Sequence, residues 1–120
     1  ETAAELGCTK IAFGHHKDDI AQTILMNMLF EGQISGMCPK QEMFGGKVFL
    51  IRPLAYIEEK EISLFAKTNK YPVSKCNCSF GETSKRAYVK KFLNELEKVC
   101  PPVKSNVFKS LSRIKKDYLF

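Results

Sequence analysis

The chain has 120 residues, enough for one domain that buries an apolar core without disulfide bonds. It holds no run of about 18 apolar residues, and its first residues, ETAAELG, are not a basic and apolar leader. Five cysteines, an odd number without a secretion signal, favour free thiols or metal ligands over a disulfide framework. We therefore expect a soluble, cytoplasmic protein with no membrane partner.

The net charge of +6 is unevenly distributed along the chain. Residues 1–83 carry 9 basic and 10 acidic side chains, whereas residues 84–120 carry 10 basic and 3 acidic ones. Such a basic segment is typical of a protein that binds a polyanion, most often nucleic acid. A lysine-rich helical face that only keeps the protein in solution accounts for the same composition, so both interpretations stay open.

The first third of the chain predicts a strand, a tight turn and a helix. ETAAEL is typical of a helix that ends at Gly7, and TKIAF predicts a short buried strand. The helix that follows covers DDIAQTILMNMLFEG, because Ile20, Ile24 and Met28 share one face and Gly32 ends the pattern.

A second strand and three more helices follow. A loop rich in glycine and proline, with MFGGKVF as a turn, leads to the strand VFLIRPL, and EEKEISLFAKTNK predicts a helix before Pro72. Thr83 or Ser84 is predicted to cap a further helix, and a last helix follows PPVKS. The apolar stripes of these two helices comprise Val89, Phe92, Leu93, Leu96 and Val99 in the first and Val107, Leu111, Ile114 and Tyr118 in the second.

This alternation predicts an α/β fold containing part of a doubly wound parallel sheet, with a basic helical extension at the carboxyl end. GHHKDD lies where the first strand ends, and ligands of parallel sheets bind outside the carboxyl ends of strands. Gly14 permits a sharp turn or the close approach of a ligand, and Asp18 and Asp19 fall at a helix N-terminus. Because two carboxylates repel phosphate, they are better suited to a divalent cation or to ribose and water. A plain helix cap accounts for the spacing equally well.

Several segments together resemble the tRNA 2-thiocytidine synthetases of the PP-loop ATPase superfamily. They are TKIAFGHHKDDIAQT, NMLFEG, IRPLAYI and the cysteine after YPV, within residues 3–92. Gln22 stands where the family usually has glutamate, and Cys76-Asn77-Cys78 is one residue shorter than the family's form. The family's phosphate loop and paired-cysteine motif do not occur in this sequence. We therefore expect the carboxyl-terminal part of a longer enzyme, inactive as this chain alone.

The resemblance implies a two-step reaction on transfer RNA. A pyrimidine carbonyl would be adenylated by ATP with Mg²⁺, and a sulfur donor would then displace AMP. Residues 1–75 would be the carboxyl-terminal portion of the PP-loop ATP-binding domain, and residues 76–120 a cysteine loop with a basic helical extension. The implied site comprises Asp18 and Asp19 as catalytic residues and Gly14, His15, His16 and Asp19 as residues that bind the nucleotide.

The cysteines suggest a metal centre that needs further ligands. Cys76 and Cys78 are too close and too few to build a four-ligand zinc site alone. The resemblance implies a [4Fe-4S] cluster, to which Cys76, or Cys78 in its place, would add one ligand to two from outside the chain. The other three cysteines, Cys8, Cys38 and Cys100, are expected to be packed thiols.

The helix SKRAYVKKFLNELEKV places its basic residues near the cysteine loop. Phosphate contacts of a bound tRNA are expected from Lys85, Arg86, Lys90 and Lys91. Phe80 and Tyr88 could stack on a base, although an aromatic near a helix start is more often core. We also expect a homo-oligomer. Two alternatives stay open: another PP-loop ligase or amidase, which the basic segment disfavours, and a noncatalytic RNA-binding or zinc module, which GHHKDD disfavours.

Overall fold

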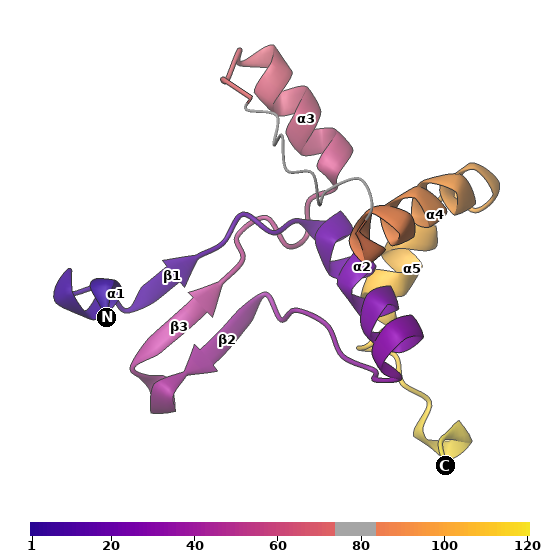
Figure 1. Cartoon of the computed structure of the whole chain (residues 1–120), viewed down its shortest axis with the longest axis horizontal. Helices are drawn as coiled ribbons and strands as arrows, with labels where there is room; N and C mark the ends of the chain where they lie inside the picture. The colour runs from indigo at the N-terminus through magenta and orange to yellow at the C-terminus, as the bar shows by residue number, and fades with distance from the viewer. Residues whose placement is uncertain (74–83) are drawn as a thin grey trace.

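The computed structural model describes residues 1–73 and 84–120. The described elements are α1 (Thr2–Glu5), β1 (Lys10–Ala12), α2 (Lys17–Met26), the π-helix η1 (Asn27–Glu31), β2 (Lys40–Met43), the 3-10 helix η2 (Phe44–Gly46), β3 (Val48–Ile51), α3 (Glu59–Thr68), α4 (Lys85–Val99), α5 (Val103–Ser110) and the 3-10 helix η3 (Lys116–Tyr118). Helices α2, α4 and α5 pack together beside the sheet, and α3 extends away from them (Figure 1).

Three strands form the sheet in the order β1-β3-β2. β1 and β3 run parallel, with Lys10 opposite Phe49 and Ala12 opposite Ile51. Helix α2 lies in the connection between these two strands, as the alternating pattern of the sequence predicts. The predicted α/β class is therefore confirmed.

β2 is an antiparallel edge strand in a segment that the sequence predicts to be a loop. It pairs with β3, with Lys40 opposite Ile51, and η2 makes the turn between the two strands. Gly45 and Gly46 both have positive φ angles, 66° and 85°, so the interpretation of Gly-Gly as a turn is confirmed. The loop prediction was wrong because KQEM is polar and mostly exposed, so no apolar alternation reveals the strand.

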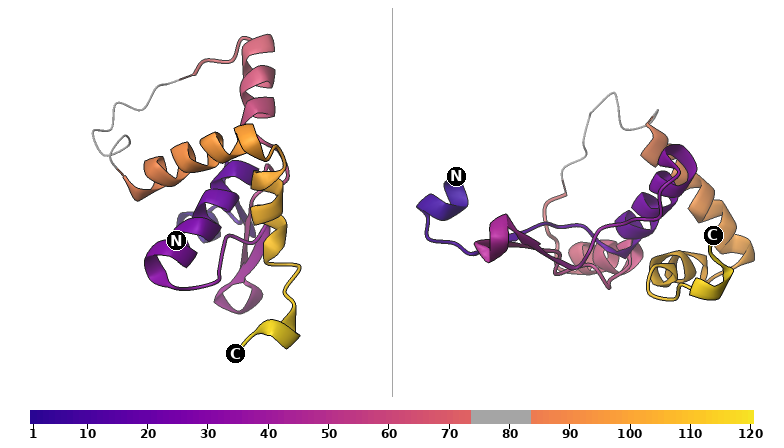
Figure 2. Two further views of the ribbon diagram at one scale, coloured as in Figure 1. Left: turned by 90° about the vertical axis from the view of Figure 1, so that its right-hand side faces the viewer. Right: turned by 90° about the horizontal axis from the view of Figure 1, so that it is seen from below.

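β1 is not the buried strand that TKIAF predicts. All three of its residues are exposed, including Ile11. The helix cluster lies beyond the carboxyl ends of β1 and β3 instead of across a face of the sheet (Figure 2). The apolar residues of the strand are thus not covered by the described part of the chain.

The core forms around α2, which is buried on two sides. On one side Ile20 and Ile24 pack with Ala55 and with apolar residues of α5. On the other side Ala21 packs against Val89 and Leu93 of α4. Full burial of each large aliphatic side chain stabilises the fold by about 1.5–3 kcal/mol, so these few residues hold the three helices together.

The helices end close to, but not always at, the predicted residues. α2 continues as η1 and stops at Gly32, which is left-handed as predicted for a helix end. The hydroxyl of Ser84 accepts a hydrogen bond from the Ala87 amide (3.1 Å), which confirms Ser84 as the cap of α4.

Two predicted apolar stripes are shorter than the sequence suggests. On α2 and η1 Met28 is exposed, and on α4 Val99 is 86% exposed although Val89 and Leu93 are buried. α5 ends at Ser110, so Ile114 and Tyr118 lie outside the helix and are exposed. Within the described residues, no helix combines the length and the apolar character required to cross a bilayer.

Candidate functional site

The carboxyl ends of β1 and β3 bring His15 and Arg52 together. The Phe13 amide donates to the Ile51 carbonyl (2.9 Å), so the segments that follow β1 and β3 leave the sheet side by side. The Phe13 ring stacks on His15, with centroids 5.5 Å apart, and Arg52 Nε donates to His15 Nδ1 (3.4 Å). Arg52 also donates to the carbonyl of Cys38. His15 is thereby held in place, while its Nε2 has no partner among the described residues.

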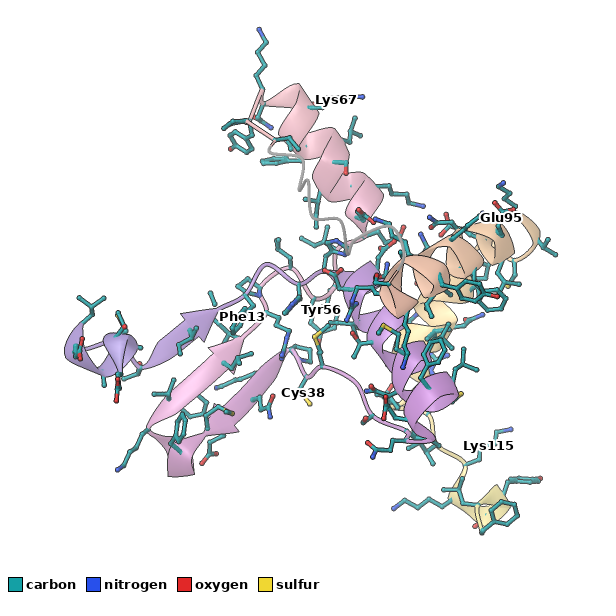
Figure 3. The ribbon with its side chains drawn as sticks, in the orientation of Figure 1. Phe13, Cys38, Tyr56, Lys67, Glu95 and Lys115 are labelled. Carbon is teal, nitrogen blue, oxygen red and sulfur yellow. The ribbon has the colours of Figure 1, made fainter. Side chains whose placement is uncertain are left out.

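Figure 3 labels Phe13 at this strand end, Tyr56 in the segment that follows β3, and Cys38 just before β2. A groove of about 330 Å³ adjoins it, lined by Cys38 and Tyr56 together with residues of α2 and α5. Its walls are mostly apolar, so charged chemistry belongs to the neighbouring Gly14–Asp19 segment.

His16 and Asp19 cap α2 reciprocally. His16 Nδ1 accepts from the Asp19 amide (3.3 Å), and Asp19 Oδ2 accepts from the His16 amide (3.0 Å). This is a capping box, so the plain-cap interpretation of these two residues is realised in the structure. Asp19 Oδ1 has no partner among the described residues, and it can still bind a ribose hydroxyl, a water or a cation.

The amino terminus of α2 offers few free amides to a phosphate. The Lys17 amide donates to the Ile57 carbonyl (2.9 Å), and the Asp19 amide is used by the cap. Two neighbouring carboxylates add repulsion. A phosphate docked directly on this helix end is therefore disfavoured, as the sequence indicates.

Asp18 is a buried junction between three helices. Its residue is 3% exposed. Its Oδ2 accepts from Lys104 Nζ of α5 (2.8 Å), and its Oδ1 accepts from the Glu59 amide at the start of α3 (3.0 Å). Lys104 also lies 3.4 Å from the Glu97 carboxylate. Both oxygens of Asp18 are thus engaged within the protein, and its predicted catalytic role remains a prediction.

The contacts at this junction shift two pKa values in opposite directions. Burial by itself raises the pKa of Asp18, but hydrogen bonds from Lys104 and the Glu59 amide, with the charge of Lys104, outweigh it and lower the pKa below its ordinary value. Burial likewise lowers the pKa of Lys104, yet Asp18 and Glu97 raise it above its ordinary value. Both groups are therefore charged at neutral pH.

Gly14 is not required by the fold itself. Its φ lies outside the left-handed region, and a Cβ built on it would meet no atom within 4 Å. A sharp left-handed turn therefore does not explain this glycine, whereas close approach of a ligand remains a sufficient reason for it.

The four basic residues predicted to contact RNA have different environments. Arg86 is used internally, since its guanidinium donates to the Asp19 carbonyl (3.3 Å), to Gln22 Oε1 (3.4 Å) and to Thr23 Oγ1 (3.0 Å). Lys90 pairs with Glu59 at 3.0 Å, and Lys85 lies over the ring of Phe30. Lys91 is exposed and has no ion pair among the described residues.

The predicted metal ligands Cys76 and Cys78 lie outside the described residues, as do Phe80 and Thr83. The described part of the chain contains no group of three or more histidine, cysteine or acidic residues that could hold a metal. The expectation of packed thiols was wrong for Cys8 and Cys38, which are exposed, while Cys100 is half-buried. Cys8 follows the exposed turn at Gly7, and Cys38 lies on the rim of the groove.

Two residues that contact the Gly14–Asp19 segment, Arg52 and Lys104, were not identified from the sequence. Arg52 directly follows β3, the strand parallel to β1, so the expected parallel pairing could have placed it beside His15. Lys104 lies far along the chain from Asp18, and no local pattern connects the two residues.

Comparison with known proteins gives a consistent family. The sequence model of the PP-loop domain family (ATP_bind_3) matches residues 1–96. A tRNA-cytidine(32) 2-sulfurtransferase of Geobacter sulfurreducens is 42% identical over 119 residues, which cover 98% of this chain and 46% of that protein. One of Burkholderia cenocepacia is 42% identical over 118 residues, which cover 98% of this chain and 36% of that protein. The chain thus spans less than half the length of these curated relatives.

A solved structure resembles this chain in fold as well. It is the U34-tRNA thiolase NcsA from Methanococcus maripaludis with its [4Fe-4S] cluster, at 26% identity and a TM-score of 0.76. The match covers 99% of this chain and 40% of that one. The resemblance drawn from GHHKDD and IRPLAYI is therefore confirmed at the level of the family, and the chain belongs to the PP-loop domain family.

Proposed function

We propose that this chain acts as part of an ATP-dependent tRNA thiolation enzyme. The observation that carries the proposal is 42% identity, across 98% of the chain, to proteins named tRNA-cytidine(32) 2-sulfurtransferases. The likeness to a U34-tRNA thiolase supports the same reaction class. The basic composition of residues 84–120 is in keeping with an RNA substrate.

The reaction replaces a carbonyl oxygen of a pyrimidine, and we take this to be the 2-oxygen of a cytidine. The oxygen attacks the α-phosphorus of ATP and pyrophosphate leaves, which converts a poor leaving group into an adenylate. A sulfur nucleophile then attacks the activated carbon, the carbon–oxygen bond breaks, and AMP departs. Mg²⁺ would neutralise charge on the phosphates, and a [4Fe-4S] cluster would present the sulfur.

The described residues suit a supporting part in this chemistry. We assign the nucleotide to the neighbourhood of Gly14, His15 and Asp19, where His15 Nε2 can donate a hydrogen bond, since its Nδ1 accepts from Arg52, and Asp19 Oδ1 can accept one. His16 fixes Asp19 through the capping box. Asp18 holds α2 against α3 and α5. The phosphate grip would come from a segment of a longer enzyme that lies outside this chain.

Two further assignments depend on the resemblance and on NcsA. Cys76, or Cys78 in its place, would supply one ligand to the cluster, with other ligands from outside this chain. Residues 1–75 would belong to the ATP-binding domain, and residues 76–120 would form the cysteine loop and its basic helical extension.

The proposed function is tested by the nucleosides of the tRNA. We expect the full-length protein, supplied with ATP and a sulfur source, to form 2-thiocytidine that mass spectrometry detects in digested tRNA. Asp19→Asn should abolish this product, because it weakens ligation at the half-buried carboxylate, and tRNA affinity should be nearly unchanged. Lys67→Ala on the exposed surface of α3 is the control and should thiolate normally. If ATP is consumed with a metabolite and no thiolated nucleoside forms, the protein is another PP-loop ligase.

A further inference from the structure

Half of the basic side chains in residues 84–120 are already engaged within the protein. They make ion pairs, internal hydrogen bonds or a contact with an aromatic ring, and they are Lys85, Arg86, Lys90, Lys98 and Lys104. Of the other five, Lys91 lies on α4, and four lie together between residues 109 and 116. The free positive charge is thus concentrated after α4, away from the helix on which RNA contacts were predicted.

We propose that Lys109, Arg113, Lys115 and Lys116, here called the terminal basic segment, form the principal surface that binds the phosphate backbone of the tRNA. All four side chains are exposed, and none has an ion-pair partner among the described residues. Asp117 is the only acidic residue after Glu97. The proposal rests on the proposed function only for the identity of the RNA as tRNA.

Stabilisation of a helix end does not account for the segment. A cation in the last turn of a helix interacts favourably with the macrodipole, and this explains Lys109 at the end of α5. The effect falls off within that turn. Arg113, Lys115 and Lys116 lie beyond the end of the helix at Ser110, so they need another reason.

A purely solubilising role does not account for the segment either. Exposed apolar and aromatic residues accompany the cations, since Ile114 is half exposed and Tyr118 is 85% exposed. Surfaces that only favour solubility avoid such side chains, whereas RNA-binding surfaces combine cations with aromatic rings on which bases stack. The composition of the terminal basic segment therefore favours RNA binding over a purely solubilising role.

The segment is connected to the candidate site by a short, well-anchored helix. Lys104 in the first turn of α5 binds Asp18, and Lys109 lies in the last turn. Five residues of helix span about 8 Å, so a phosphate held at Lys109 lies on the same rigid element as the partner of Asp18. Figure 3 places Lys115 beyond the end of α5 and well away from Glu95 of α4.

The test compares two quadruple variants of the full-length protein that remove the same charge. The first replaces Lys109, Arg113, Lys115 and Lys116 with alanine. The control replaces four exposed lysines elsewhere that also have no ion pair within residues 1–73 and 84–120, and they are Lys10, Lys47, Lys67 and Lys70. Affinity for tRNA is measured against salt concentration, with thermal melting to confirm that both variants fold.

We expect the first variant to lower the slope of log affinity against log salt by about 3, since each lost phosphate contact removes about 0.7–0.9. The control should change it by less than about 1. An equal decrease of the slope in both variants would mean that only net charge matters, and it would overturn the proposal. An unchanged slope in the first variant would overturn it as well. Loss of binding to phosphatidylserine vesicles with an unchanged tRNA slope would also overturn it, by assigning the segment to a membrane.

The outcome separates this proposal from the proposed function. If wild-type protein forms 2-thiocytidine while the first variant keeps its slope, the surface is wrong and the function stands. If no thionucleoside forms but the slope falls only in the first variant, the RNA surface stands and the function fails.

Discussion

Asp18 and Lys104 show how one buried side-chain contact can hold in place the helix that begins at the candidate site. The pair is buried, with side-chain exposures of 4% and 12%, and it joins α2 to α5. Because the folded pKa of Asp18 is lowered, its contribution to stability is complete above the ordinary aspartate pKa and is lost as pH falls through the folded value. Because the folded pKa of Lys104 is raised, the contribution of Lys104 to stability is lost only as pH rises through this folded pKa.

Lys104→Met should therefore destabilise the protein by about 3–5 kcal/mol at neutral pH, since it leaves a buried carboxylate uncompensated. The pKa of Asp18 should rise in the variant, so mild acid should narrow the difference from wild type. Melting temperatures between neutral and acidic pH measure both effects. Lys98→Met is the matched control, because it breaks an exposed pair worth at most about 1 kcal/mol. Indistinguishable melting of the two variants would contradict the role given to Asp18.

Gly14 and Gly36 offer a second comparison between single residues. Gly14→Ala should leave stability unchanged, because the added Cβ meets nothing. If a nucleotide approaches that backbone closely, the same methyl group should weaken ATP binding about tenfold, a cost within the 1–3 kcal/mol of overpacking. Calorimetric titration of the full-length protein with ATP measures this.

Gly36→Ala is the opposite case. Its Cβ would lie 2.8 Å from Ile24 Cγ1 and 3.0 Å from Leu111 Cδ1, so we expect a lower melting temperature. For Gly14→Ala, an ATP affinity equal to that of wild type would show that no ligand closely approaches the backbone at Gly14.

Helix α4 is attached to α2 by two kinds of contact, apolar packing and the hydrogen bonds of one arginine. Val89 and Leu93 pack against Ala21, and Arg86 spans three acceptors on α2. The sequence predicted α4 correctly from Ser84 and its apolar spacing, because capping and periodicity are local properties. It did not predict that Arg86 turns inward, since that depends on acceptors more than 60 residues away.

Arg86→Ala should consequently affect stability more than RNA binding. We expect a loss of about 1–3 kcal/mol from unmade internal hydrogen bonds, with an unchanged salt slope for tRNA. Arg86→Lys should not restore the stability, because an ammonium cannot span three acceptors as the planar guanidinium does. A salt slope reduced by about 1 with an unchanged melting temperature would instead make Arg86 a phosphate ligand.

At the scale of the whole molecule, the sequence predicted the order of elements better than their environment. β1 and β3 were expected from their apolar residues, but burial of β1 depends on what covers the sheet, which periodicity cannot show. β2 was missed because pairing with β3 defines it, whereas its own residues are polar. In the candidate site, residues 14–19 are contiguous and were found together, while Arg52 and Lys104 come from distant segments and could be found only through tertiary contacts.

The distance in sequence between Asp18 and Lys104 also has a consequence for the order of folding. The chain is synthesised from its amino end, so Asp18 is made long before its partner is available. Until Lys104 emerges, burying the Asp18 carboxylate is unfavourable, because a charge removed from water without a partner costs several kcal/mol. Helix α2 can form early from its own cap, but its final docking must wait for α5. The candidate site is thus among the last parts of the chain to be completed as the nascent protein folds.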